Sequence, residues 1–443
     1  MRDIFLFVII FGLIPVMLKF PQIGILTWSW VSYMNPHRLA YGFAYDFNFL
    51  DYIALFALLG ILFSKEKKIF PRHPITYLLA LYFFWVSLTT LFAINHEVAI
   101  PKYITLVKIL LFTFATLLIM QSRVRINALI WVIVLSIGFY AFKGGIFTIL
   151  TGGSGRVWGA PGSFFGDNNH FALVLLMIVP ITIYLIQVTE DKRLKIGLAV
   201  LTMCEIMAIF GTQSRGALVG MVCMFTFFAW KAKKLWILVI LFPFLGAIGF
   251  MFMPDSWKER MASIERYEED ASAQGRLTMW RVAIDVANDN PVLGGGFNVF
   301  YDDGVRTQYL RPGEEGRAVH SVHFEVLGEH GYAGYLIFFM LALTTYLTGN
   351  RIIREAKANP RFKWCGELAA MIQISMVGYA SAGAFVNLAT FDLYYHLVAI
   401  MVMTRVVMAR EMAAEAATEH PKNRTSGLQQ TGPAHPTGKI ATT

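Results

Sequence analysis

Three short stretches of this 443-residue chain combine residue types that could do chemistry together. FGTQSRGALVG holds Arg215, GRLTMWRVAIDVANDNPVLGGGFNVF holds Arg276, and HSVHFEVLGEHGYAG begins with His320. An arginine side chain can bind a phosphate group through two parallel hydrogen bonds, and a neutral imidazole can take a proton from a hydroxyl group. The three stretches therefore point to group transfer from a phosphorylated donor, assisted by a general base.

Arg215 lies in a connection so short that it must sit at or just inside a membrane boundary, at the start of the next helix. Backbone N–H groups and the positive end of that helix would point outward there, which suits an anion. The alternative is an arginine that only reaches the lipid headgroups. Its position alone leaves both interpretations open.

The stretch around Arg276 predicts an amphipathic helix, then a turn, then a glycine-rich loop. Arg276, Trp280, Ala283 and Ala287 share one face of that helix. The glycines at 294–296 could let the backbone approach a phosphate, or they could form only a flexible turn. The lysine and the spacing of nucleotide-binding phosphate loops are missing.

The third stretch contains His320, His323, Glu325, Glu329 and His330. The order of a zinc-binding HExxH motif is absent and no cysteine joins the group, so we expect no metal here. A neutral imidazole that acts as a base, oriented by a neighbouring carboxylate, fits better. The alternative is a set of solvated histidines on a helix outside the membrane.

Membrane helices must position these stretches, because most of the chain is apolar. It is 56% hydrophobic and 15% charged, against roughly one quarter charged in globular proteins. We therefore expect an all-α, polytopic membrane protein with about 12 transmembrane helices. The first apolar segment, 4–34, is broken by Pro15 and Pro21 and could form one kinked span or two short pieces. The other apolar segments fall at 49–63, 74–93, 103–120, 126–150, 166–188, 194–211, 215–230, 235–253, 332–349, 366–387 and 390–409.

The composition divides the chain into four regions. Transmembrane helices fill 1–253, a polar loop domain follows at 254–331, and further transmembrane helices occupy 332–410. The remaining tail, 411–443, is rich in Ala and Glu and then in Thr, Pro and Gly, which predicts disorder.

Lysine and arginine gather in every second connection, which predicts the orientation in the membrane. The basic connections are SKEKKIFPRH, QSRVR, EDKRLK, KAKK and RIIREAKANPRFK. The positive-inside rule places them in the cytoplasm together with the C-terminus, and the 254–331 loop on the outer face. Isolated basic residues on that outer face, such as Lys102 and Arg156, disobey the bias and are functional candidates. Asp167 opens the helix at 166–188, where an ordinary N-cap is the favoured interpretation.

These candidates share the outer face, and together they suit one kind of reaction. Several cations and one histidine, without a metal cluster, suit a doubly charged diphosphate leaving group. The base would deprotonate an incoming hydroxyl group, and the apolar scaffold would hold the lipid tail of the donor. We expect no cofactor, no nucleotide and no nucleic acid.

The chain resembles the O-antigen ligase/polymerase superfamily of bacterial envelope glycosyltransferases, including its O-glycosylation ligase branch. The resemblance to the superfamily rests on GTQSRGALVG, on the Arg-x-x-x-Trp helix with its glycine-rich loop, and on HSVHFEVLGEHGYAG, in that order. The resemblance to the branch rests on the opening third of the chain, including WSWVSYMNPHRLAYGFAYDFNFLD. It implies a GT-C-like fold in the bacterial inner membrane, with the active site facing the periplasm. Ser321 departs from the Asn that many members of the superfamily carry at this position.

The resemblance implies roles for single residues. Arg215 and Arg276 would contact the undecaprenyl diphosphate of the donor, and His320 would act as the base. We add a set of supporting candidates: Lys102, Arg156, Arg281 and Glu329.

The function that this implies is an O-antigen ligase. Such an enzyme transfers polysaccharide en bloc from undecaprenyl diphosphate to a sugar hydroxyl of lipid A-core, in an inverting and metal-independent reaction of lipopolysaccharide biosynthesis. The alternatives are an O-antigen polymerase and a protein O-oligosaccharyltransferase, which use the same donor. A transporter is disfavoured, because it predicts paired charges at mid-membrane and internal repeats.

Overall fold

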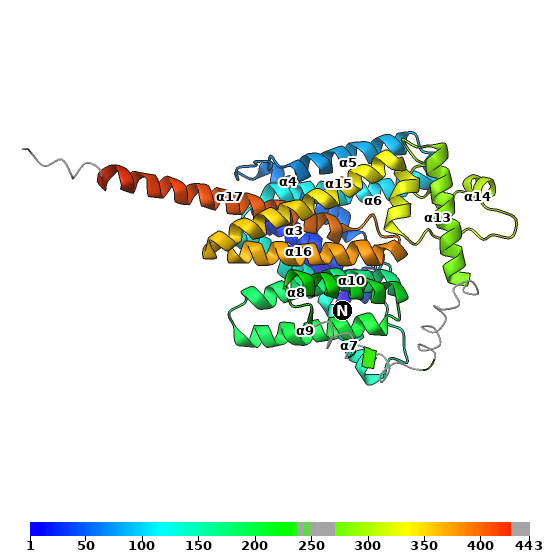
Figure 1. The fold of residues 1–443 in the computed structure, drawn as a ribbon, viewed down its shortest axis with the longest axis horizontal. Coiled ribbons are helices and arrows are strands. Elements are labelled where there is room, and N and C mark those ends of the chain that lie inside the picture. The colour runs from blue at the N-terminus through cyan, green and yellow to red at the C-terminus, as the bar shows by residue number, and fades with distance from the viewer. Residues whose placement is uncertain (237–242, 244–245, 248–254, 256–270, 427–443) are drawn as a thin grey trace, which may run out of the picture.

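The structure, a computed structural model, describes residues 1–236, 243, 246–247, 255 and 271–426. Within these residues the secondary structure is helical and no strand occurs. Figure 1 shows a bundle of roughly parallel helices with one helix, α13 (Ala271–Asp289), lying across one end. The predicted apolar segment 235–253 and the start of the predicted loop, 254–270, lie largely outside the described residues.

Seven helical stretches in the described part of the chain are long and apolar enough to cross a membrane. They are α5 (Pro74–Leu91), α6 (His96–Ile119), α7 (Arg123–Leu150), α8 (Asn168–Val188), α9 (Lys192–Gly211), α15 (Val322–Ala358) and the stretch Pro360–Phe385. That last stretch comprises η3 (Pro360–Phe362), α16 (Lys363–Ala382) and η4 (Gly383–Phe385). The chain is therefore a polytopic, all-helical membrane protein, and the number of about 12 spans stays a prediction.

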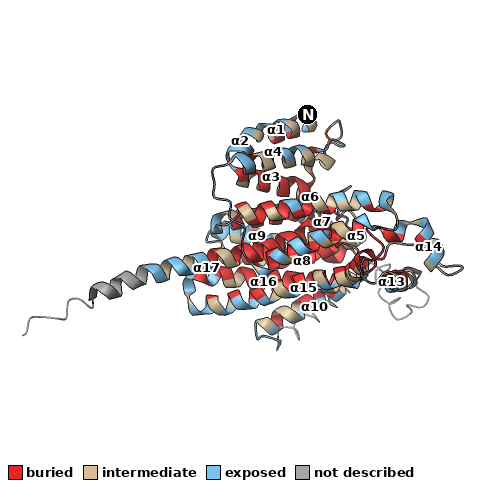
Figure 2. Cartoon of the chain, turned by 90° about the horizontal axis from the view of Figure 1, so that it is seen from above, coloured by how far each residue is buried: buried red, intermediate tan, exposed pale blue. Residues whose placement is uncertain are grey.

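Three further helices of the bundle are not among these seven stretches. They are α4 (Phe49–Phe63), α10 (Arg215–Lys231) and α17 (Asp392–Ser426). The first half of α17 is almost wholly buried, and the helix then leaves the bundle (Figures 1 and 2). Because α17 continues to Ser426, the first part of the predicted disordered tail is helical instead. Ala and Glu dominate that part, and both are strong helix formers.

The first apolar segment is neither one continuous helix nor two. It forms α1 (Arg2–Gly12), α2 (Ile14–Lys19) and α3 (Pro21–Met34), and a short helix η1 (Pro36–Leu39) follows. Pro15 and Pro21 lie in the first turns of α2 and α3, where the missing proline N–H costs nothing.

Polar residues begin most of the long helices. The side chains of Asn95, Ser122, Asp167, Ser214 and Ser321 each accept a hydrogen bond from a backbone N–H in the first turn that follows. An N-cap of this kind stabilises a helix by about 1 kcal/mol. The N-cap predicted at Asp167 is thereby confirmed.

The centre of the bundle is α8, which is buried over most of its length (Figure 2). It packs against α7, α9, α10 and α16, and α16 packs in turn against α15 and α17. The helices α1 and α2 lie at the edge of the bundle, beside α4.

Hydrogen bonds between connections define two ends of the bundle. At the end crossed by α13, Asn168 donates to the carbonyl of Thr212, and His170 contacts the carbonyl of Asn387. We call this the α13 end. At the other end, Arg125 pairs with Glu66, and the arginine-rich and lysine-rich connections gather there. We call this the basic end.

The α13 end carries a second, smaller hydrophobic core. It is formed by α13, η2 (Val299–Tyr301), α14 (Asp303–Tyr309) and the chain that leads into α15. Its buried members include Met279, Ala283 and Val286 of α13, with Phe300 and Val319 opposite. This core fixes α13 at the end of the membrane bundle.

Candidate functional site

Trp280 joins α13 to the chain that carries His320. Its Nε1 donates to the carbonyl of Val319 at 3.0 Å, and its ring stacks on Phe324 with 5.0 Å between centroids. Arg276 lies one turn before Trp280 on the same helix, so both flank the chain at His320. The helical spacing in the sequence placed Arg276 and Trp280 on one face, and in the structure that face lies against the chain before α15.

His320 is held in an unusual backbone conformation directly before α15. Its φ of 45° lies in the left-handed region, where non-glycine residues are uncommon. Burial, and then the positive charge of Arg276, lower the pKa of His320 below its usual value of 6.5. The imidazole is therefore neutral at pH 7, which is the form that a general base requires.

Arg215 is the first residue of α10, where backbone N–H groups point out of the helix end. The neighbouring Gly216 packs so closely on Phe385 that an added Cβ would lie 2.8 Å from the Cβ of that residue. The ring of Phe385 also lies 6.4 Å from that of Trp280. The elements that carry Arg215, Arg276 and His320 therefore meet around these two aromatic rings.

A second histidine lies close to His320. His170 contacts Asp167 through Nδ1 at 3.2 Å and the carbonyl of Asn387 through Nε2 at 3.1 Å. Both His170 and Asp167 act electrostatically on His320. Burial alone would raise the pKa of Asp167, but hydrogen bonds from His170 and from the backbone of Asn169 lower it, so the carboxylate is charged. The sequence favoured an N-cap role for Asp167, only three residues before His170, and gave no sign that His170 would lie near His320.

A polar cavity of about 370 Å³ opens beside His170. Its lining includes Lys102, Asn298, Tyr301, Glu325 and Asn387. This mixture of amide, hydroxyl, carboxylate and ammonium groups suits a ligand rich in hydroxyl groups.

Lys102 is held in a buried ion triad. Its Nζ lies 2.6 Å from Glu325 and 2.7 Å from Glu329, and the side chains are 14%, 5% and 3% exposed. Glu325 also accepts from the backbone N–H of Ala389, and Glu329 from that of Asn298. The triad ties α6 to the head of α15 and to the loop, and its two carboxylates surround the Lys102 ammonium group.

The other supporting candidates lie apart from His320. Arg281 donates to Asp285 and to Glu314, on a different face of α13 from Arg276. Arg156 lies over the ring of Trp158 in the connection before α8. Neither contact brings a guanidinium group to the candidate base.

The two remaining histidines of the third stretch have structural partners. His323 donates from Nε2 to the carbonyl of Ala380, and His330 contacts the hydroxyl of Thr89. In the part of the chain that the structure describes, no cluster of three or more His, Cys, Asp or Glu side chains could hold a metal ion.

The glycine-rich loop is not a phosphate cradle. Gly294 donates to the carbonyl of Asn290, while Gly295 and Gly296 donate to the carbonyls of Gly328 and Glu329 at 2.8 and 2.9 Å. All three N–H groups are therefore used within the protein. The loop forms a backbone seam with the head of α15, which is why side chains are missing there.

Two family models match parts of the chain. Residues 198–339 match the family model described as O-Antigen ligase, which spans Arg215, Arg276 and His320. This match supports assignment to the O-antigen ligase superfamily, whose members are membrane glycosyltransferase-like enzymes. Residues 1–190 match a second model, described as Family of unknown function (DUF5935). No curated protein matches the chain.

Proposed function

We propose that the chain is an O-antigen ligase that transfers polysaccharide from undecaprenyl diphosphate to a sugar hydroxyl of lipid A-core. The observation that carries the proposal is the neutral His320 beside Arg276, within the part of the chain that matches the O-antigen ligase family. The active site would face the periplasm from the inner membrane, as the charge bias of the connections predicts.

In the proposed reaction the acceptor oxygen attacks the anomeric carbon of the donor sugar. The new C–O bond forms as the bond from that carbon to the diphosphate oxygen breaks, with inversion at the carbon. Arg276 and the N-terminus of α10 with Arg215 would stabilise the charge that develops on the leaving diphosphate. His320 would take the proton of the acceptor hydroxyl group.

The polar cavity beside His170 would hold carbohydrate next to the reacting carbon. Its volume of about 370 Å³ falls within the ~300–1,000 Å³ typical of small-molecule sites. Glu325 and Asn387 on its wall offer acceptors for sugar hydroxyl groups, and Lys102 is neutralised by its two carboxylates. The diphosphate would therefore lie outside this cavity, on the side of Arg276.

Reconstitution of the purified protein tests the proposal. Liposomes with lipid-linked O-antigen would receive lipid A-core, a second lipid-linked chain, or a protein acceptor. Transfer to lipid A-core is the expected result. Transfer only to a second lipid-linked chain would make the protein a polymerase, and transfer only to protein would make it an oligosaccharyltransferase.

Two arginine variants test the diphosphate contacts. Arg276→Ala is expected to lower the rate by at least ~100-fold, because it removes a charge-assisted contact to the leaving group. Arg281→Ala is the matched control, since Arg281 lies on the same helix but pairs with Asp285 and Glu314. Equal rates for the two variants would contradict the assignment of Arg276.

A further inference from the structure

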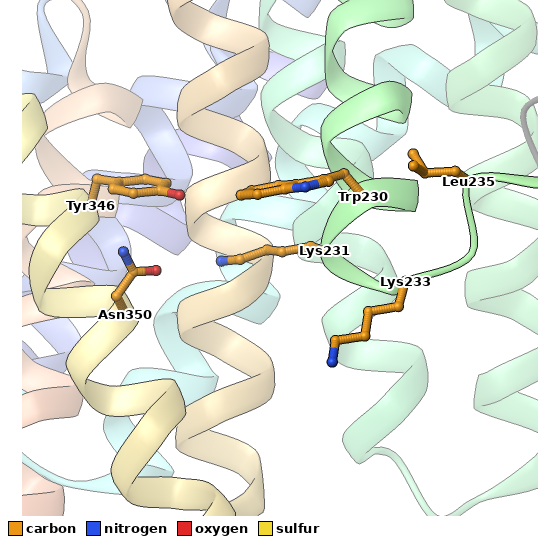
Figure 3. A pocket seen from close by; sticks show the side chains of 6 residues that line it. All are labelled: Trp230, Lys231, Lys233, Leu235, Tyr346 and Asn350. Carbon is orange, nitrogen blue, oxygen red and sulfur yellow. The ribbon is translucent and has the colours of Figure 1, made fainter.

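A cavity of about 630 Å³ lies at the basic end, between the last turn of α10 and the middle of α15. Trp230, Lys231, Lys233, Tyr346 and Asn350 line it, together with Leu235 (Figure 3). Arg215 begins α10 and Lys231 ends it, and a helix of 17 residues is ~25 Å long. This cavity is therefore distinct from the site around His320.

Lys231 is the central feature of this cavity. Its Nζ is buried and has no hydrogen-bond partner among the described residues. It lies 5.5 and 5.8 Å from the ring centroids of Phe227 and Tyr346. Figure 3 shows its side chain extending from α10 toward Asn350 of α15. A buried ammonium group without an acceptor is costly, so an anion in this cavity would supply what the protein does not.

Lys233 contributes a second cation from a fixed backbone position. Its N–H donates to the carbonyl of Trp230 and that of Lys234 donates to Ala229, which closes the C-terminus of α10. Its φ of 55° is left-handed, at a position where glycine is the usual residue. A lysine here costs about 1–2 kcal/mol relative to glycine, so the chain keeps a cation at the expense of backbone strain.

The surroundings of the two lysines indicate a lipid. Tyr346 also lines an apolar groove of about 250 Å³ between α15 and α16, where Phe339, Leu343 and Met376 supply the walls. Trp230 is 58% exposed, in the interfacial position that tryptophan favours in membranes. Tyr346 thus borders both the cationic cavity and the apolar groove, and the two together complement a charged headgroup and its acyl chain.

We propose that this cavity binds an anionic glycerophospholipid, with its phosphate between Lys231 and Lys233 and an acyl chain in the groove beside Tyr346. Basic pockets between transmembrane helices bind lipid headgroups in this way. The alternative is that these lysines serve only the charge bias that orients membrane proteins. The charge bias alone does not require that the Nζ of Lys231 be buried, or that the backbone of Lys233 adopt a left-handed conformation.

Native mass spectrometry of the full-length protein in detergent tests the proposal. Phosphatidylglycerol and the zwitterionic phosphatidylcholine would be titrated separately, and soluble glycerol phosphate would be added in a third series. We expect phosphatidylglycerol to bind at least ~10-fold more tightly than phosphatidylcholine, because its headgroup has a net negative charge whereas the choline ammonium group of phosphatidylcholine repels the two lysines. Equal binding of the two lipids would overturn the proposal, and equal binding of glycerol phosphate would overturn the role of the acyl chain.

Three variants localise the binding. Lys231→Met and Lys233→Gly should each weaken phosphatidylglycerol binding by about tenfold or more, and Lys233→Gly should not lower the melting temperature because it relieves the strained φ. Lys363→Met is the control, since Lys363 is also basic but 77% exposed and paired with Glu367. An equal loss in the control, or no loss in Lys233→Gly, would refute the site. Sugar transfer by the wild-type protein is measured separately, so failure here leaves the proposed function untouched.

Discussion

Replacing Lys102 by methionine should strongly destabilise the α13 end of the protein. The change leaves Glu325 and Glu329, which are 5% and 3% exposed, without their shared cation. Each carboxylate would keep a single backbone N–H, from Ala389 or from Asn298. Removing one partner of a buried ion pair costs about 3–5 kcal/mol, which is a large share of the ~5–15 kcal/mol that stabilises a typical protein.

The assay is unfolding of the full-length protein in mixed micelles by a denaturing detergent. Lys108→Met is the matched control on the same helix, because Lys108 pairs with Asp51 while both side chains are over 40% exposed. The control should lose at most about 1 kcal/mol. Combining Lys102→Met with Glu325→Gln and Glu329→Gln should recover most of the loss, since no buried charge remains. Equal losses in the two single variants, or no recovery in the triple variant, would refute this account.

Three further predictions concern the site and its supports. His320→Ala should lower the transfer rate by about 10²–10⁴-fold. His323→Ala should retain transfer, because the imidazole of His323 donates to the carbonyl of Ala380. Similar rates for the two variants would contradict the assignment of His320 as the base. Burial and Arg276 lower the pKa of His320 below 6.5, so the transfer rate should rise with pH along a limb centred below pH 6.5. Arg276→Gln should move that limb of the residual activity to higher pH. An unmoved limb would show that Arg276 does not act on the pKa of His320. Gly294→Ala should lower the free energy of unfolding by about 1–3 kcal/mol. The φ of Gly294 is +68°, and the added Cβ would lie 2.5 Å from the backbone nitrogen of residue 331. Unchanged stability would show that the backbone around the loop adjusts to the added Cβ.

The apolar segments predicted most of the membrane helices, because the length of a span and its hydrophobicity are local properties. The α-helices at 49–63, 74–91 and 168–188 begin or end within a few residues of the predicted bounds. The three-part start of the chain was harder to predict, since Pro15 and Pro21 are each compatible with a kink or with a new helix.

The site was predictable in part. The spacing of Arg276 and Trp280 placed them on one face, and the structure brings that face to His320. The burial of Lys102 between two carboxylates could not be predicted, because it depends on contacts between residues far apart in the sequence. The same reason hid the neighbourhood of His170, which only the folded chain brings beside His320.

The backbone seam at the glycine-rich loop also limits how a substrate would reach His320, if His320 is the base that we propose. The seam continues beyond the loop, since Ile94 donates to the carbonyl of Gly295 and Tyr332 donates to that of Pro291. A flap that lifted here would have to break these bonds together, so we expect a lipid-borne donor to reach His320 laterally, between helices.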